Sequence, residues 1–436
     1  MGRVDTVITD SRKRLLAECR LLARTLSPTI SADLLPAVVD GFSSQQVRSW
    51  RQNGISPEHS IHKMMPRVGG FPPALARYFI AAYSGPGDIV FDPYCGKGTV
   101  LFEATTGGRT ALGGDVAPDA VIATRAKCVP VSFSQVANYV QGLDYQRGRS
   151  GEVVSADVRL FFHSDTFKQI VSVRDQLLDD MASPCGPTRN AATFVCGVML
   201  GILHGHSRSS LSLPCNQCFA MAPNYVRRYV REHGLERPRR DVRQCLLDKM
   251  MLLLPRPALI GRARVFQGSA EVCTEYLGRW SGAIDLVITS PPYLNRQTYS
   301  KDAWLRQWFL GYDHREVAKR SLETGSVQLF VDAMQRSLRA ILSVVKPGGR
   351  LVLVGGRARI VVGKKAEVVR IVDLCLQALK GVNADSTIAS VDAVIEDRRV
   401  MSRGSYFAVH AGRAAGDGGG RRFGEEDILI IRKRPE

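Results

Sequence analysis

Hydrophobic and polar residues follow two different periods along the chain, and the changes between them divide it into four segments. Residues 1–60 are polar, with apolar residues at helical spacing over 12–26, which predicts a helical N-terminal extension. Residues 61–130 and 261–436 alternate short apolar runs with helical periods, whereas residues 131–260 follow the helical period almost throughout. Strand–helix alternation is typical of a parallel sheet. The pattern therefore predicts an α/β domain in two halves, separated by a mainly helical insertion.

The individual elements follow from these runs. In the first half we expect strands at 88–92 and 110–115 and helices at 74–83, 99–105 and 118–127. In the second half we expect helices at 327–344 and 367–379 and strands at 264–266, 284–289, 350–354, 391–395, 406–409 and 427–431. The glycine-rich stretch 414–420 predicts a hairpin tip.

A glycine loop, Asp92-Pro93-Tyr94-Cys95-Gly96-Lys97-Gly98-Thr99, joins the first predicted strand to the next helix. Glycines at such a turn let the backbone approach a ligand, and the helix N-terminus offers unpaired N–H groups. Asp115 ends the following strand, where an acid typically binds ribose hydroxyls. The loop and this acid together predict a nucleotide-like ligand.

Two nucleotide-binding motifs are missing from the sequence, and their absence restricts the type of ligand. Neither Gly96-Lys97 nor Gly363-Lys364 is followed by Ser or Thr, so the phosphate-binding P-loop is absent. Leu101 stands where the third glycine of the dinucleotide fingerprint would fall. A ligand with a ribose but no pyrophosphate fits better, and S-adenosylmethionine is the common one.

The tetrapeptide Ser290-Pro291-Pro292-Tyr293 follows another predicted strand. Prolines there form a rigid lip over the crevice in which α/β sheets bind ligands, and their carbonyls are free to point at a substrate. The Ser290 hydroxyl and a proline carbonyl can accept hydrogens from an exocyclic amine, while the Tyr293 ring stacks on the base. A structural proline turn with a packed tyrosine is the alternative interpretation, and the glycine loop elsewhere in the chain disfavours it.

These two motifs resemble those of the S-adenosylmethionine-dependent amino-methyltransferases, and residues 62–73 are similar to the family motif that lines the methionine end of the cofactor. Serine at the first tetrapeptide position is typical of bacterial site-specific cytosine-N4 DNA methyltransferases, whereas Asn or Asp is more typical of adenine-N6 and tRNA guanine-N2 enzymes. The resemblance implies a Rossmann-like methyltransferase fold with target recognition in the insertion. Tyr94 replaces the usual Phe, and Ser269 stands where relatives often have Asp. The implied cofactor residues are Phe71, Pro72, Asp92, Tyr94, Gly96, Gly98, Thr99, Asp115 and Ser269; the implied catalytic residues are Ser290, Pro291, Pro292 and Tyr293.

Charge points to a polyanionic partner. The chain carries 59 Lys and Arg against 41 Asp and Glu, a net charge of +18. The insertion contributes strongly, since residues 223–264 hold eleven basic and four acidic side chains, with Tyr225 and Tyr229 among them. We expect double-stranded DNA as the partner, and candidate backbone contacts from Arg227, Arg228, Arg231, Arg239 and Arg240.

Other chemistries are less well supported. Pro184-Cys185 and Pro214-Cys215 lack the Glu-Asn-Val partner of cytosine-C5 enzymes. A single C-x-x-C pair, Cys215 and Cys218, favours free thiols over a zinc site, and Trp304 and Trp308 are more typical of core packing than of base stacking. No apolar run reaches membrane-spanning length, and the ten cysteines show no disulfide spacing, so we expect a cytoplasmic protein without a membrane partner.

Three functions remain open. A cytosine-N4 DNA methyltransferase is favoured, with base flipping and with a separately encoded restriction endonuclease as a candidate partner. The same chemistry on adenine N6 or on an RNA base is the nearest alternative. A nucleic-acid-binding protein with an inactive cofactor pocket is the alternative from another class, for which Ser269 is the sequence indication.

Overall fold

A computed structural model describes most of the chain. The described residues are 13, 17–18, 29–31, 59–67, 72–146, 155–215, 220–294, 299–362, 365–384, 386–400 and 423–435. Of the helix predicted over 12–26, residues 13, 17 and 18 are described, and they are helical. The strand predicted at 406–409, the hairpin tip at 414–420 and the candidate cofactor residue Phe71 lie outside the described residues.

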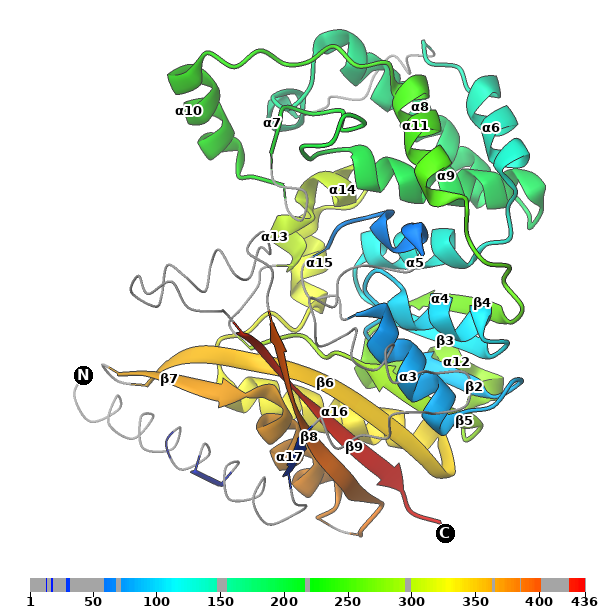
Figure 1. Cartoon of the computed structure of the whole chain (residues 1–436). Coiled ribbons are helices and arrows are strands. Elements are labelled where there is room, and N and C mark those ends of the chain that lie inside the picture. Colours follow the sequence, from blue (N-terminus) through cyan, green and yellow to red (C-terminus); the bar gives the residue numbers. More distant parts are fainter. Residues whose placement is uncertain are drawn as a thin grey trace.

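One sheet organises the structure (Figure 1). Its strand order is β1-β8-β9-β6-β5-β2-β3-β4, with β7 paired to β6 alone. The strands are β1 (Thr29–Ser31), β2 (Ile89–Asp92), β3 (Thr110–Asp115), β4 (Arg262–Gln267), β5 (Ile284–Thr289), β6 (Val345–Val362), β7 (Lys365–Arg370), β8 (Ala389–Val400) and β9 (Phe423–Lys433). Neighbours from β4 to β6 are parallel, while β9 is antiparallel to both β6 and β8. The order β4-β3-β2-β5-β6 is that of a Rossmann-like sheet, as predicted.

Helices cover both faces of this sheet, so its central strands are buried on both sides. Val90 packs in the cluster formed with α3 and α4, and the next residue, Phe91, packs in the cluster formed with α16 and α17. The same alternation along β5 and β6 explains their almost continuous apolar sequences. The covering helices are α3 (Pro73–Tyr83), α4 (Thr99–Thr106), α5 (Pro118–Cys128), α12 (Cys273–Leu277), α16 (Val327–Val344) and α17 (Ile371–Val382).

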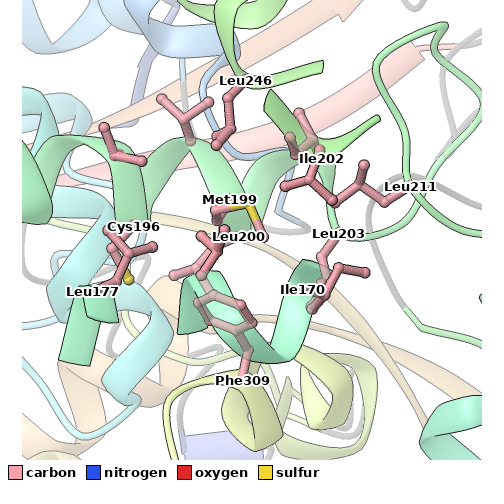
Figure 2. Packing of buried hydrophobic residues seen from close by; sticks show 14 of the residues in the cluster. Ile170, Leu177, Cys196, Met199, Leu200, Ile202, Leu203, Leu211, Leu246 and Phe309 are labelled. Atoms are coloured by element: carbon pink, nitrogen blue, oxygen red, sulfur yellow. The ribbon is translucent and has the colours of Figure 1, made fainter. Parts of the chain in front are cut away.

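The segment between β3 and β4 is mainly helical, as predicted, and most of one hydrophobic core comes from it. That core also includes buried residues from outside the segment, such as Met64, Phe102 and Leu305. Its further helices are α6 (Phe133–Gly142), α7 (Ala156–Arg159), α8 (Ser164–Ala182), α9 (Pro187–Ile202), α10 (Pro223–His233) and α11 (Val242–Leu253). Figure 2 shows α9 side chains such as Met199 and Leu200 beside Phe309, which comes from α14 (Trp304–Phe309) in the second half of the chain. The helical part, residues 131–260, therefore packs onto α14, which follows the tetrapeptide in the sequence.

Three predicted elements need correction. The helix expected at 367–379 begins only at Ile371, because residues 365–370 pair antiparallel with β6 as strand β7. The strand expected at 350–354 is part of the much longer β6. The N-terminal segment, expected to be helical, contributes strand β1, which pairs parallel with β8. Among the described residues, no helix is long and apolar enough to span a membrane.

Candidate active site

The carboxyl ends of β2, β3 and β5 meet at a cavity of about 380 Å³. This is the place where open α/β sheets bind ligands, and the volume suits a small-molecule site. The cavity is lined by residues from both predicted motifs, such as Asp92 and Ser290, which lie far apart in the sequence. Of the predicted site residues it is lined by Asp92, Tyr94, Gly96, Thr99, Asp115, Ser269, Ser290 and Pro292. Pro72, Gly98, Pro291 and Tyr293 are described but do not line it.

The glycine loop needs its glycines for two separate reasons. Gly96 and Gly98 have φ angles of 50° and 72°, in the left-handed region that side chains disfavour. A Cβ at Gly98 would also lie 2.8 Å from the side chain of Thr124. Gly98 does not line the cavity. Because it has no side chain, α4 can begin close to Thr124 of α5. Thr99, the first residue of α4, is buried beside the cavity, and its hydroxyl has no hydrogen-bond partner among the described residues.

Asp115 ties the glycine loop to the end of β3. Its carboxylate accepts hydrogen bonds of 2.9 Å from the backbone N–H groups of Gly96 and Ala117. Burial raises the pKa of this carboxyl group, and the Arg67 guanidinium opposes that effect. Because each oxygen has a further lone pair, the carboxylate can hold the loop and still accept a hydrogen bond from a ribose hydroxyl.

Asp92 lies deeper, at the end of β2. Its Oδ1 accepts hydrogen bonds from the Thr289 hydroxyl at 2.6 Å and from the Tyr94 backbone at 3.1 Å. Burial raises the pKa of Asp92 to about 7, and the nearby carboxylate of Asp115 adds to that effect. Both carboxyl groups therefore face one cavity in a strongly desolvated setting, an arrangement that is common in functional sites.

The opposite wall comes from η3 (Ala270–Val272) and α16. The Ser269 hydroxyl caps η3 by accepting a hydrogen bond of 3.2 Å from the backbone of Glu271. The Glu271 carboxylate forms an ion pair of 2.7 Å with Arg336 on α16. The Tyr94 hydroxyl donates a hydrogen bond of 2.8 Å to Ser337. These contacts connect the glycine loop and η3 to helix α16.

Arg67 is a cavity residue that the sequence interpretation did not single out. It forms an ion pair with the buried carboxylate of Asp119, and its guanidinium lies 5.8 Å from the ring centre of Tyr299. The residue falls within the segment 62–73 that resembles a cofactor motif, so its neighbourhood was indicated although its role was not. It supplies positive charge next to Asp115.

The tetrapeptide is divided between the cavity and the core. Ser290 and Pro292 line the cavity, whereas Tyr293 is only 7% exposed and donates a hydrogen bond of 3.3 Å to Glu426. Its ring occupies space left by Gly356, where a Cβ would lie 2.9 Å from the ring. The Tyr293 ring therefore does not line the cavity, and its contact with a substrate base stays a prediction.

A different tyrosine lines the cavity. Tyr299 and Ser300 are in α13 (Tyr299–Asp302), which follows the tetrapeptide. The Ser300 backbone and hydroxyl both donate hydrogen bonds of 2.8 Å to Glu323, another cavity residue. Burial raises the pKa of Tyr299 to about 12, so its hydroxyl is neutral at physiological pH.

The five candidate DNA-binding arginines lie in the helical part, outside the cavity lining. Arg227, Arg228 and Arg231 are exposed on α10. Arg227 pairs with Asp157 and Arg228 with Glu232, while Arg239 lies 3.2 Å from Asp165. Arg240 is half-buried, and its backbone exchanges hydrogen bonds with Thr166.

The tryptophan pair and the C-x-x-C pair are the two alternative sites that the sequence offered. Trp304 and Trp308 pack against the hydrophobic core of the helical part, as predicted. Within the described residues, no group of three His, Cys, Asp or Glu side chains could hold a metal ion. Cys218 of the C-x-x-C pair lies outside them.

The residues present fit S-adenosylmethionine. The left-handed glycine loop, the unpartnered hydroxyl of Thr99 and the carboxylate of Asp115 are suited to the polar groups of a nucleoside-based cofactor. The Arg336–Glu271 pair and the Tyr94 ring form the far wall.

Comparison with known proteins agrees with this assignment. Residues 42–124 match the family model described as DNA methylase, which groups N6 and N4 enzymes. The type II methyltransferase M.MjaII of Methanocaldococcus jannaschii is 36% identical over 58 residues, or 13% of this chain and 11% of that protein. The match thus spans about 11% of the curated relative's length.

Solved structures are similar only at a coarse level. An S-adenosylmethionine-dependent methyltransferase from Methanosarcina mazei has 10% identity and a TM-score of 0.31, covering 82% of this chain and 98% of its own. An rRNA methylase from Streptococcus thermophilus has 9% identity and a TM-score of 0.29, covering 84% and 98%. Such scores carry no functional weight, and the fold rests on the strand order. The match at residues 42–124 makes this part of the chain similar to the DNA methylase family. The glycine loop and the strand order agree with that similarity, and the residues of the cavity fit S-adenosylmethionine.

Proposed function

We propose that the chain is a site-specific DNA methyltransferase that acts on the N4 amine of cytosine. The observation that carries this proposal is the position of Ser290, which lines the same cavity as the glycine loop and Asp115. Hydrogen-bond acceptors beside a methyl-donor site are what an amine substrate requires. The DNA methylase family match at 42–124 supports the amine class but includes both N6 and N4 enzymes.

In the proposed reaction the protein acts by positioning and by electrostatics. S-adenosylmethionine, when bound, would supply an electrophilic methyl group: a C–N bond forms as the C–S bond breaks, the neutral thioether leaves, and the methylated nitrogen releases one proton to water. Ser290 Oγ would accept one amine hydrogen, which localises the nitrogen lone pair toward the methyl group. Pro291 and Pro292 would hold the serine rigidly, since their φ angles are fixed. No covalent bond to the protein is needed.

We also propose that the helical segment 131–260 recognises the target DNA. Its exposed arginines on α10 would contact the DNA backbone, and the target base would leave the duplex at a cost of a few kcal/mol. Because the ring of Tyr293 is packed in the core, Tyr299 is the better candidate to contact the flipped base. A restriction endonuclease, if one acts with this protein, would be a separate chain.

A single substitution tests the proposal. Ser290→Ala removes the hydroxyl acceptor and should lower methyl transfer to DNA about a hundredfold or more, because a preorganised polar group at the reacting atoms is lost. DNA affinity and cofactor affinity should stay within about twofold of wild type. Ser343→Ala, an exposed serine on α16, is the matched control. A Ser290→Ala protein that retains full activity would contradict the catalytic role, and a protein that loses DNA binding equally would make that role structural.

A further inference from the structure

Helix α10 presents a ladder of aromatic rings to solvent. Tyr225 and Tyr229 are 40% and 37% exposed, although large apolar rings usually pack inward. Their ring centres are 5.8 Å apart with planes inclined by 11°, and the His233 ring continues the series 4.1 Å beyond Tyr229. The residues are four positions apart, so they share one side of the helix. We call Tyr225, Tyr229 and His233 the α10 ladder.

Nothing in the described packing explains this exposure. Val226 is the single buried residue of α10, so one narrow side of the helix fastens it to the body. Figure 1 shows α10 standing away from the other helices, joined to them by extended stretches of chain. The ladder therefore lies on a projecting element, where a partner can reach it.

The charges around the ladder are complementary to a nucleic acid. Arg227, Arg228 and Arg231 lie on the same helix, which has one acidic residue, Glu232. The Arg228 guanidinium lies 5.7 Å from the ring centre of Tyr225, so the cation and the ring already form one mixed surface. Arginines combined with stacked aromatic rings are typical of proteins that bind unpaired bases, whereas contacts to the phosphates of an intact duplex need only the cations.

The segment just before α10 is hydrogen-bonded to α13, which lines the cavity, and to α14. The backbone N–H of Ala220 donates a hydrogen bond of 2.8 Å to the carbonyl of Asp302, the last residue of α13. The Trp304 indole donates a hydrogen bond of 3.3 Å to the carbonyl of Met221. Because α13 carries Tyr299 and Ser300 on the cavity, the ladder is anchored to the same element that contacts the substrate pocket.

We propose that the α10 ladder stacks on DNA bases that have left the double helix. This inference rests on the proposed function for the identity of the nucleic acid and deepens it. A target base that flips out leaves its neighbours unstacked, and the ladder offers them a replacement surface at its Tyr225 end, beside the Arg228 guanidinium. Stacking of this kind is tolerant of sequence, so the ladder adds affinity for unpaired strands rather than base specificity.

The test compares single-stranded and duplex DNA of the same sequence by fluorescence anisotropy at fixed salt, using the full chain. The double variant Tyr225→Ala/Tyr229→Ala should bind the single strand about tenfold or more weakly and the intact duplex within about threefold of wild type. The matched control, Tyr225→Phe/Tyr229→Phe, keeps the rings and should behave as wild type. Circular dichroism checks that each variant is folded, and both tyrosines are exposed, so folding should not change.

Several outcomes would overturn the inference. These are unchanged single-strand affinity in the alanine variant, an equal loss on both DNA forms, an equal loss in the phenylalanine variant, or no binding of either DNA by the wild type. Stronger, ladder-dependent binding of RNA of the same sequence would also reject DNA as the ligand. Failure of the proposed function is separate, because methyl transfer by the wild-type protein is measured independently of the single-strand preference.

Discussion

The Thr289 hydroxyl donates a hydrogen bond of 2.6 Å to the carboxyl group of Asp92. Thr289 ends β5 and precedes the Ser-Pro-Pro-Tyr tetrapeptide, and Asp92 ends β2 and begins the glycine loop. The two strands are parallel neighbours, so their carboxyl ends lie at the same edge of the sheet. This buried contact therefore joins the start of the glycine loop to the residue that precedes the tetrapeptide, although 197 positions separate Asp92 from Thr289 in the sequence.

Replacement of Asp115 should weaken cofactor binding. Asp115→Asn keeps the size of the side chain but turns one of two backbone-binding oxygens into a donor, which cannot face the N–H of Gly96 or Ala117. Loss of a charged acceptor costs about 1.5–3 kcal/mol, so the Kd for S-adenosylmethionine should rise at least about tenfold in calorimetric titration. Glu275→Gln, on the exposed side of α12, is the control. An unchanged Kd in Asp115→Asn would exclude this residue from the site.

Asp92 should make the cofactor-free protein less stable as pH rises. Burial raises its pKa from about 3.9 to about 7, so the folded state disfavours the ionised form. Its contribution to stability is complete below the unfolded pKa and is lost as pH rises toward about 7. Thermal unfolding at a series of pH values should show that Asp92→Asn gains stability over wild type between about pH 4 and 7. If the stabilities of the two proteins change in parallel with pH, Asp92 is ionised in the folded protein without a loss of stability.

His62 should have the opposite effect on stability, so that the protein becomes less stable as pH falls. It lies 2.7 Å from Glu103 in a buried cluster with Arg77, and burial lowers its pKa to about 4. The unfolded chain takes up a proton below about pH 6.5 and the folded chain does not, so stability is lost as pH falls from about 6.5 to about 4.

The same unfolding series tests this effect. His62→Gln keeps a hydrogen-bond donor for Glu103 but does not titrate, so it should be less stable than wild type at pH 7 and lose less stability on acidification. If the His62→Gln protein loses as much stability on acidification as wild type does, His62 is not the source of that loss.

Gly201 should be required for stability where helix α9 packs against the backbone of Met64. A Cβ at this position in α9 would lie 1.8 Å from the carbonyl oxygen of Met64, a backbone atom that cannot turn aside. Gly201→Ala should lower the free energy of unfolding by about 1–3 kcal/mol or more in urea denaturation.

Gly142→Ala is the matched control for that substitution. Gly142 ends α6, and a Cβ added there would have no atom within 4 Å, so alanine should be neutral or stabilising by up to about 1 kcal/mol. Equal effects of the two substitutions would mean that α9 can move away from Met64 without cost.

Local sequence patterns were sufficient to predict much of the cofactor half. Strands β2 and β3 and helices α4 and α5 each carry their own period and end signals, and the glycine loop lies between strand and helix as expected. Strand β7 could not be predicted in this way. Its residues, Lys365–Arg370, form a strand because β6 extends far enough to pair with them, which is a tertiary effect.

The candidate site shows the same division. The cavity gathers most of the residues predicted from the two motifs, because their backbone positions follow from the strand ends. The direction of the Tyr293 side chain depends on Gly356, which lies on another strand, and the position of Arg67 depends on Asp119 in α5. Such distant partners leave no local signal in the sequence.

Identification of the methylated nucleoside tests the central claim most directly. The protein is incubated with labelled S-adenosylmethionine and unmethylated DNA, the DNA is digested to nucleosides, and the labelled product is identified by mass spectrometry. We predict N4-methylcytosine with wild type and a strongly reduced amount with Ser290→Ala. N6-methyladenine would contradict the base assignment, and no labelled nucleoside despite bound cofactor would contradict DNA as the substrate.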